Sequence, residues 1–292
     1  MNIVFGKNGQ VASCLRDFLL QDGSHNQWHF VDSKECNFSK PQNVYEFLSN
    51  LSFVPKIIIN TSAYTAVDLA ESEQDLAMNI NAYAVGKIAQ YCKENNTMLF
   101  QYSTDYVFNG DGSNPFAPTD TAIPINYYGI SKLAGERLIV QSGCNYYIMR
   151  TSWVYSQYGK NFVKTMLNLS QKKEEISIVC DQIGSPTNAN DIAKMTITML
   201  NKNFNFGIYH FTGDGFCSWY DFACEIIKNT SQFMLVKTQI ILPILTAQFP
   251  TPAIRPLNSR LNNGTLQEFS TPWLISLEKV MKQLIFDNEN NS

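Results

Sequence analysis

The segment that decides the fold is Asn2-Ile3-Val4-Phe5-Gly6-Lys7-Asn8-Gly9-Gln10-Val11-Ala12, an apolar run followed directly by a glycine turn. The apolar run predicts a strand, and the residues after the turn predict a helix. Gly6 and Gly9 permit a tight turn in which backbone N–H groups meet a pyrophosphate at the start of that helix. Because the spacing is G-x-x-G-x-x-A and not the G-x-G-x-x-G of larger dehydrogenases, the motif needs support from the rest of the chain.

Strands and helices alternate through the first half of the chain. Apolar or aromatic runs predict strands at residues 3–5, 28–31, 56–60, 98–102 and 146–150, and apolar residues at helical spacing predict a helix over 74–94. This alternation predicts an α/β fold, a Rossmann-type doubly wound parallel sheet.

The pattern changes after Arg150, where aromatic and turn-rich segments precede a further helix at 190–200 and a strand at 208–211. We therefore predict an NAD(P)-binding Rossmann domain over residues 1–152 plus about 188–212. The smaller, interleaved substrate-binding lobe is predicted over residues 153–187 and 213–286. The polar residues 287–292 are predicted to form a disordered tail.

The composition is that of an enzyme without nucleic-acid or metal partners. A net charge of -3 and the absence of a basic run argue against binding to a phosphate backbone. The seven cysteines form no C-x-x-C pair and the three histidines have no metal-ligand spacing, so we expect reduced thiols and no metal site. The apolar runs are far shorter than the roughly 20 residues of a transmembrane helix, and no signal peptide is visible. We therefore expect a cytoplasmic protein.

A tyrosine and a lysine four residues apart, Tyr128 and Lys132, carry the chemistry. In a predicted helix over 126–141 the i, i+4 spacing places their Cβ atoms about 5–6 Å apart on one face. A free tyrosine titrates near pH 10, so we expect the Lys132 ammonium to lower the pKa of the Tyr128 phenol. Thr104, at the end of the fourth strand, can hydrogen-bond a substrate carbonyl while Tyr128 protonates the developing alkoxide.

Asp32 lies at the end of the second predicted strand, where an acid often accepts hydrogen bonds from the adenosine ribose. This position favours NADH. Lys7, Ser33 and Lys34 are suitable neighbours for the 2′-phosphate of NADPH, so both cofactors stay open.

Further blocks of sequence support a reductase and occur in order along nearly the whole chain. They are Phe5-Gly6-Lys7, Gly9-Gln10-Val11, Thr65-Ala66-Val67-Asp68, Ala70-Glu71-Ser72-Glu73, Tyr102-Ser103-Thr104-Asp105-Tyr106-Val107-Phe108, Lys132-Leu133-Ala134-Gly135-Glu136, Arg150-Thr151-Ser152-Trp153-Val154-Tyr155, and Ala253 with Arg255-Pro256 and Asn258-Ser259-Arg260-Leu261. With these blocks the chain resembles the extended short-chain dehydrogenase/reductases, and within them the dTDP-4-dehydrorhamnose reductase family.

The resemblance implies hydride transfer from NADPH or NADH to the C4 carbonyl of dTDP-4-dehydro-L-rhamnose, which gives dTDP-L-rhamnose for cell-surface polysaccharides. Tyr128 would be the proton donor, Thr104 would polarise the ketone, and Lys132 would orient the cofactor. The positions that match the family's cofactor contacts are Gly6, Gly9, Gln10, Val11, Asp32, Asn37, Phe38, Ala63, Tyr64, Thr65, Tyr102, Tyr128 and Lys132. The positions that match its substrate contacts are Thr104, Asp105 and Trp153, with Arg255 as a clamp for the diphosphate.

Several positions depart from the family pattern. Asn37 precedes Phe38 where relatives often carry an aspartate, Tyr64 stands where they commonly carry a histidine, and Ile254 replaces the first of two arginines near the diphosphate. Cys14 and Asn190 stand where some relatives carry magnesium-binding glutamates, so we expect a monomer or a homodimer without a magnesium bridge.

Two alternative functions stay open at this point. One is reduction of another nucleotide-linked 4-keto-6-deoxy sugar. The other is a non-catalytic, NADP-binding regulatory subunit, which the retained Thr104, Tyr128 and Lys132 argue against.

Overall fold

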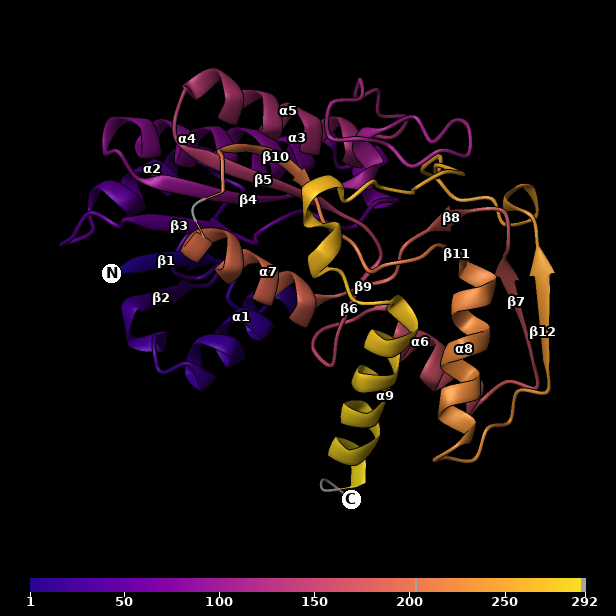
Figure 1. Cartoon of the computed structure of the whole chain (residues 1–292). Coiled ribbons are helices and arrows are strands. Elements are labelled where there is room, and N and C mark those ends of the chain that lie inside the picture. Colours follow the sequence, from indigo (N-terminus) through magenta and orange to yellow (C-terminus); the bar gives the residue numbers. More distant parts are fainter. Residues whose placement is uncertain (203, 290–292) are drawn as a thin grey trace.

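A parallel sheet forms the centre of the larger part of the molecule (Figure 1). Within residues 1–202 and 204–289, which the computed structural model describes, six strands lie in the order β10-β5-β4-β3-β1-β2, and all neighbours are parallel. Their bounds are β1 (Asn2–Phe5), β2 (Trp28–Val31), β3 (Ile57–Asn60), β4 (Met98–Thr104), β5 (Tyr146–Thr151) and β10 (Gly207–His210). The predicted doubly wound parallel sheet is confirmed.

Helices cover both faces of this sheet, as Figure 1 shows. One face carries α2 (Pro41–Ser49), α4 (Ala84–Glu94) and α5 (Tyr127–Ser142), and the other carries α1 (Gln10–Gln21) and α7 (Ala189–Lys202). Along β1 the side chains alternate between the two cores: Ile3 and Phe5 join the first, and Val4 joins the second. The fully apolar strand is explained by burial on both sides.

The segment predicted as one helix over 74–94 is divided. It consists of α3 (Gln74–Met78), a π-helical turn (Asn79–Tyr83) and α4. Asn81, in the π-helical turn, is buried and donates hydrogen bonds from Nδ2 to the Tyr64 carbonyl (3.0 Å) and to Ser131 Oγ on α5 (2.9 Å). The periodicity predicted the apolar face of the helix correctly, but it carried no signal for the wider turn.

A further hydrophobic core lies beside the sheet, at the lower right of Figure 1. It is built by α6 (Phe162–Ser170), α8 (Trp219–Ser231), α9 (Trp273–Glu289) and the parallel pair β7 (Glu175–Val179) and β12 (Ile240–Ile244). Short pairs join β6 (Val154–Tyr155) to β9 (Thr187–Asn188) and β8 (Ile183–Gly184) to β11 (Cys217–Ser218). The tail predicted to be disordered from residue 287 starts inside α9, which continues to Glu289; residues 290–292 lie outside the described residues.

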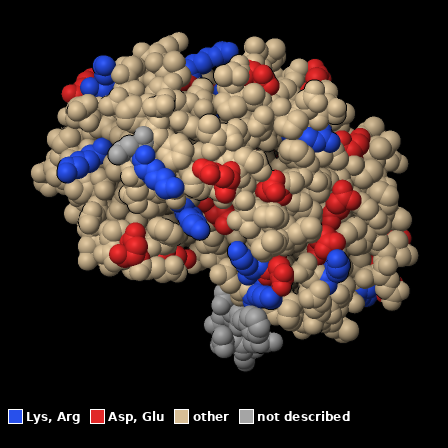
Figure 2. Space-filling view, viewed as in Figure 1, with Lys and Arg blue, Asp and Glu red and all other residues tan. Residues whose placement is uncertain are grey.

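Charged side chains of both signs are interspersed over the face shown in Figure 2. Of the helices within the described residues, none is both long enough and apolar enough to cross a membrane. Among the same residues, no group of three or more His, Cys, Asp or Glu side chains is placed to hold a metal ion.

The glycine turn after β1 tolerates no side chain at Gly6, which has a φ of +88°. A Cβ there would lie 2.4 Å from Thr61 Oγ1 and 2.8 Å from the Ser62 nitrogen. We expect Gly6→Ala to lower the free energy of unfolding by about 2–5 kcal/mol, since overlap adds to the left-handed backbone penalty. Urea denaturation measures this change.

Gly23→Ala is the matched control for that substitution. Gly23 also has a left-handed φ of +76°, but no heavy atom lies within 4 Å of the place that a Cβ on this residue would occupy. Its substitution by alanine should lower the free energy of unfolding by only about 1–2 kcal/mol, which is the backbone penalty alone. Equal losses in the two variants would show that the contact with Thr61 does not constrain the turn.

Candidate active site

The glycine turn presents free backbone donors at the start of α1. Gly9 precedes the first residue of the helix in an extended conformation and has no side-chain cap. Its N–H donates to the Gly6 carbonyl (2.8 Å), which closes the turn, and Thr61 Oγ1 donates to the Phe5 carbonyl (2.7 Å). The uncapped N–H groups of the first helical turn are therefore available to an anion.

A cavity of about 300 Å³ lies beside this turn, at the carboxyl ends of β1, β2 and β3. The sheet order reverses between β1 and β3, which is where doubly wound sheets bind ligands. Residues that line the cavity include Gly6, Lys7, Asn8, Gly9, Asp32, Ser33, Asn37, Phe38, Thr61, Ser62 and Ala63. The structure therefore brings together six of the predicted cofactor contacts: Gly6, Gly9, Asp32, Asn37, Phe38 and Ala63.

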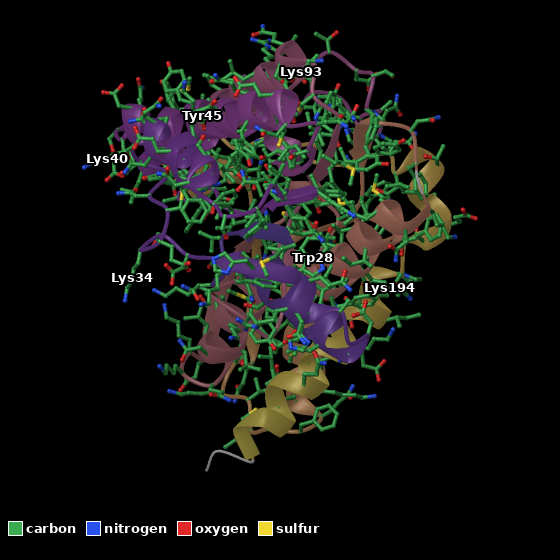
Figure 3. The ribbon with its side chains drawn as sticks, turned by 90° about the vertical axis from the view of Figure 1, so that its left-hand side faces the viewer. Trp28, Lys34, Lys40, Tyr45, Lys93 and Lys194 are labelled. Carbon is green, nitrogen blue, oxygen red and sulfur yellow. The ribbon has the colours of Figure 1, made fainter. Side chains whose placement is uncertain are left out.

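Asp32 is held by its own loop. Its Oδ1 accepts hydrogen bonds from the Lys34 N–H (2.8 Å) and the Glu35 N–H (3.2 Å), and these bonds lower the pKa of the Asp32 carboxyl. Figure 3 shows Lys34 pointing outward from this loop. Of the three predicted neighbours of a 2′-phosphate, Lys7 and Ser33 line the cavity, whereas Lys34 does not.

A second cavity, of about 660 Å³, adjoins the first and shares Asn8, Gly9, Thr61 and Ala63 with it. The predicted residues that line it are Gly9, Gln10, Val11, Ala63, Thr65, Tyr102, Thr104, Asp105, Tyr128, Lys132 and Trp153. We call it the catalytic cavity, because Thr104 from β4 and the Tyr128-Lys132 pair from α5 meet in its wall.

Burial shifts the pKa values of both Tyr128 and Lys132. Burial raises the pKa of Tyr128 above its ordinary value, and among the described groups that act on this phenol Thr104 is the one that lowers the pKa. Lys132 Nζ donates to the Tyr102 carbonyl (2.7 Å), and a lowering of the Tyr128 pKa by the Lys132 ammonium stays a prediction. Burial lowers the pKa of Lys132 to about 8, and nearby Glu136 opposes the shift.

The catalytic cavity contains polar atoms that the protein leaves unpaired. Among the described residues, Ser103 Oγ, Asp105 Oδ2 and Thr151 Oγ1 are buried without a hydrogen-bond partner. All three residues line this cavity. An unpaired buried group typically costs about 1–3 kcal/mol, so three in one wall indicate a surface shaped for a polar ligand.

Trp153 separates the catalytic cavity from a third one. Its φ is +47°, a left-handed conformation that is strained for a bulky residue. Its indole stacks on Trp219 with a centroid distance of 3.6 Å and an interplanar angle of 13°. Sequence reasoning missed Trp219, since a tryptophan at the first position of a helix shows nothing about its partner.

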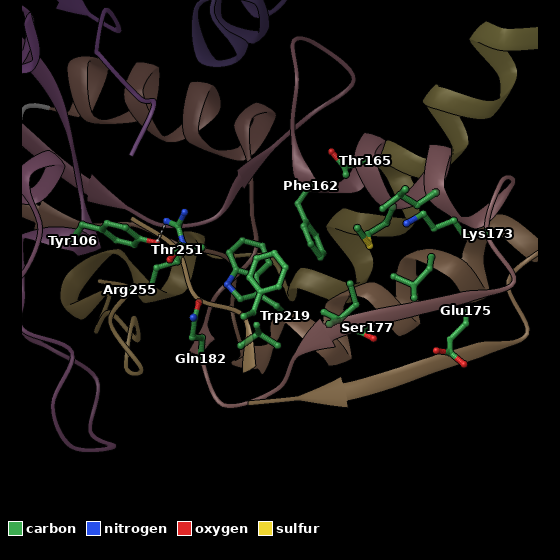
Figure 4. Close-up of a pocket in the computed structure, with 16 residues that line it drawn as sticks. Tyr106, Phe162, Thr165, Lys173, Glu175, Ser177, Gln182, Trp219, Thr251 and Arg255 are labelled. Atoms are coloured by element: carbon green, nitrogen blue, oxygen red, sulfur yellow. Dashed lines mark hydrogen bonds between the residues drawn. The ribbon is translucent and has the colours of Figure 1, made fainter. Parts of the chain in front are cut away.

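The third cavity, of about 630 Å³, is largely apolar and is shown in Figure 4. Its lining includes Tyr106, Phe162, Met166, Ile176, Ile178, Gln182, Trp219, Phe249, Thr251 and Arg255. Arg255 Nη2 pairs with Asp68 Oδ2 (2.7 Å), and its Nη1 donates to the Tyr106 hydroxyl (3.4 Å). We call this space the apolar pocket; the predicted clamp Arg255 belongs to its wall.

Comparison with known proteins agrees with this geometry. The family model of the RmlD substrate binding domain matches residues 1–286. The dTDP-4-dehydrorhamnose reductase of Escherichia coli (strain K12) is 38% identical over 295 residues, which cover 97% of this chain and 98% of that protein. The chain belongs to the dTDP-4-dehydrorhamnose reductase family.

Solved structures of other dTDP-4-dehydrorhamnose reductases have the same fold. The enzyme of Clostridium acetobutylicum superposes with a TM-score of 0.90 at 34% identity, over 97% of this chain and 99% of that one. The Bacillus anthracis enzyme, in complex with NADP, superposes with a TM-score of 0.88 at 36% identity, over 97% and 100% of the two chains.

The hydroxyl groups of two predicted cofactor contacts, Tyr64 and Tyr102, are hydrogen-bonded to other side chains of the protein. The Tyr64 hydroxyl donates to Glu73 Oε2 (2.7 Å), and Tyr64 does not line any of the three cavities described above. The Tyr102 hydroxyl shares a hydrogen bond with Thr196 Oγ1 (2.6 Å) on α7, so its backbone carbonyl is the group that meets Lys132.

Asp105 gives a pH-dependent prediction. Burial raises the pKa of its carboxyl to about 6, and the neighbouring Ser259 and Thr104 side chains oppose this shift. Because the folded pKa lies above the unfolded value near 3.9, the stabilising contribution of this group is complete below pH 4 and lost as pH rises through 6. Asp105→Asn should therefore be more stable than wild type at pH 7, by about 2–3 kcal/mol, and equal to it below pH 4.

Urea denaturation across pH 4 to 8 measures this difference. Asp111→Asn is the control, because it removes the same charge from an exposed loop position. A constant difference between Asp105→Asn and wild type over this range would contradict the assignment.

Proposed function

We propose that this chain reduces the C4 keto group of dTDP-4-dehydro-L-rhamnose to dTDP-L-rhamnose with NADPH or NADH, as an oxidoreductase acting on CH–OH groups. One observation carries the proposal: Thr104, Tyr128 and Lys132 line a cavity that adjoins the glycine-turn cavity on one side. The Trp153-Trp219 stack lies between that cavity and the apolar pocket.

The first two cavities suit a dinucleotide. The glycine turn and the N-terminus of α1 would bind the pyrophosphate, Asp32 and Phe38 would bind the adenosine, and Lys132 would bind the nicotinamide ribose. When bound, the nicotinamide supplies the hydride for C4. Lys7 and Ser33 support a 2′-phosphate, whereas Asp32 supports a free ribose, so the lining is compatible with both cofactors.

Tyr128 then supplies the proton that the C4 oxygen needs. A phenol whose pKa is raised by burial is protonated at neutral pH, so Tyr128 has a proton to donate. Thr104 Oγ1 donates to Asp105 Oδ1 (3.0 Å) and accepts from the Tyr106 N–H (3.2 Å). Rotation of this hydroxyl toward a carbonyl oxygen would place a second donor there, which stabilises the developing alkoxide.

The substrate would lie across the tryptophan stack. Trp153 would contact the sugar beside Thr104 and Asp105, and the apolar pocket would hold the nucleoside with Arg255 near the diphosphate. We propose a division into a Rossmann domain, residues 1–152 plus about 188–212, and a substrate lobe, residues 153–187 and 213–286; both tryptophans of the stack then belong to the substrate lobe, with Trp153 as its first residue.

The direct test is oxidation of NADPH and NADH by the purified protein with dTDP-4-dehydro-L-rhamnose. We expect formation of dTDP-L-rhamnose, with kcat lowered about 10²–10⁴-fold in Tyr128→Phe and cofactor affinity retained. Tyr127→Phe, the same change one position earlier in α5, is the control and should keep the wild-type kcat. Full activity in Tyr128→Phe would refute Tyr128 as the proton donor.

A second candidate substrate is another nucleotide-linked 4-keto-6-deoxy sugar. Ile254 stands in place of an arginine and is 66% exposed, which leaves one cation fewer near Arg255. Competition between several 4-keto sugar nucleotides in one assay distinguishes the two candidates, because the physiological substrate has the highest kcat/KM.

We also propose that the chain is a monomer or a homodimer without a magnesium bridge. Cys14 is buried, and burial raises the pKa of its thiol to about 12, so it does not supply an anionic ligand. Asn190 Nδ2 donates to Gln157 Oε1 (3.1 Å) and to Asn188 Oδ1 (3.1 Å). The sedimentation coefficient should be the same in millimolar magnesium and in EDTA; a magnesium-dependent increase would contradict this.

A further inference from the structure

The segment that contains Arg255 is hydrogen-bonded to residues next to α5, the helix that presents Tyr128. We call residues 250–256 the Arg255 strap. Asn126 Nδ2 donates to the Ile254 carbonyl (2.9 Å), and the Ala253 N–H donates to Asp68 Oδ1 (3.3 Å). The other oxygen of Asp68 accepts from Arg255 Nη2 (2.7 Å). One carboxylate therefore holds both the backbone and the guanidinium of the strap.

The same contacts lead to the start of α5. Asn126 caps that helix by accepting the Gly129 N–H at Oδ1 (2.8 Å). Glu71, three residues after Asp68, accepts the Tyr127 N–H at Oε1 (2.8 Å). The loop that contains Asp68 thus contacts both the strap and the first turn of the helix that presents Tyr128.

Tyr106 completes the connection between Arg255 and the catalytic tyrosine. Its hydroxyl accepts from Arg255 Nη1 (3.4 Å), as Figure 4 shows, and its ring packs edge-on against Tyr128 with a centroid distance of 5.8 Å. A guanidinium has five N–H donors, of which Asp68 and Tyr106 engage two. Three donors are left for phosphate oxygens while the guanidinium stays in place.

We propose that Asp68 is a positioning residue, which sets the place of Arg255 relative to Tyr128 and so aligns a nucleoside diphosphate with the catalytic cavity. This inference rests on the proposed function, in which the substrate is a nucleotide sugar. It assigns to Asp68 a role in substrate binding that acts through Arg255.

The direction in which nucleotide affinity changes when Asp68 is removed distinguishes a positioning role from a purely electrostatic one. A carboxylate beside a diphosphate repels it, so if Asp68 acted through charge alone, its removal would strengthen nucleotide binding. If Asp68 positions Arg255, its removal releases the guanidinium into several rotamers and weakens nucleotide binding.

The experiment measures KM and kcat for the 4-keto sugar nucleotide and, separately, the Kd of dTDP by calorimetry. In Asp68→Ala we expect KM and the dTDP Kd to rise about tenfold, with kcat within about threefold of wild type and cofactor affinity unchanged. Asp68→Asn keeps one acceptor for the two donors, so it should show a smaller rise in the same direction. A fall, or no change, in KM and Kd would overturn the proposal.

A double-mutant cycle tests the route through Arg255. Asp68→Ala should add little in an Arg255→Ala background, because the residue it positions is already absent. Additive effects would overturn the proposal. Glu278→Ala is the matched control: it breaks a 2.7 Å ion pair with Lys282 on α9, neither residue of which lines the apolar pocket, and it should leave KM and Kd unchanged.

Thermal unfolding of each variant checks that the fold is retained. If wild type bound dTDP and reduced the sugar nucleotide while Asp68→Ala behaved like wild type, only the positioning role of Asp68 would be refuted. If wild type bound no nucleoside diphosphate, the proposed function would fall as well.

Discussion

The close approach of α5 to its neighbours is the constraint on which the catalytic arrangement depends. A Cβ on Gly129 would lie 2.1 Å from the Tyr106 carbonyl oxygen, and a Cβ on Gly135 would lie 2.2 Å from the Asn81 carbonyl oxygen. Both glycines bring helix backbone directly against other backbone, one at each end of the turn that carries Lys132. The position of Tyr128 and Lys132 is therefore set by two backbone contacts, which are stiffer than contacts between long side chains.

A buried ion pair joins the same helix, α5, to strand β5. Glu136, one turn after Lys132, binds Arg150 through two hydrogen bonds, Nη2 to Oε2 at 2.6 Å and Nε to Oε1 at 2.9 Å. Burial and the charge of Arg150 lower the pKa of the neighbouring His210 to about 3, so that imidazole is neutral and adds no second cation. Such a pair is costly to bury, but losing either partner would leave an uncompensated charge. We regard it as the feature that fixes the electrostatic surroundings of Lys132.

Local patterns in the sequence predicted most of the fold and the central residues of the candidate site. The glycine turn, the apolar runs and the four-residue spacing of Tyr128 and Lys132 each reflect interactions within a short segment, so one chain is enough to predict them. The Trp153-Trp219 stack and the Asp68-Arg255 pair join residues far apart in sequence, and no local pattern indicates which residue pairs with which. The Asp105 environment was equally hidden, since burial depends on the packing of several elements.

Hydrogen bonds at the glycine turn and beside α5 join the two proposed parts of the molecule. At the glycine turn, Gln10 Nε2 donates to the Val154 carbonyl (3.4 Å), and its Oε1 accepts from Ser156 Oγ (2.9 Å) and Asn161 Nδ2 (2.9 Å). At the catalytic helix, Asp68 holds the Arg255 strap.

A rotation of one part against the other that widened the catalytic cavity would have to break more than these contacts. Ser276 Oγ also donates to Asp191 Oδ2 (2.6 Å), and Asn258 Nδ2 donates to the Asn114 carbonyl (2.8 Å). The tryptophan stack, which lies between the catalytic cavity and the apolar pocket, joins two residues of the proposed substrate lobe, so both rings would move together in such a rotation.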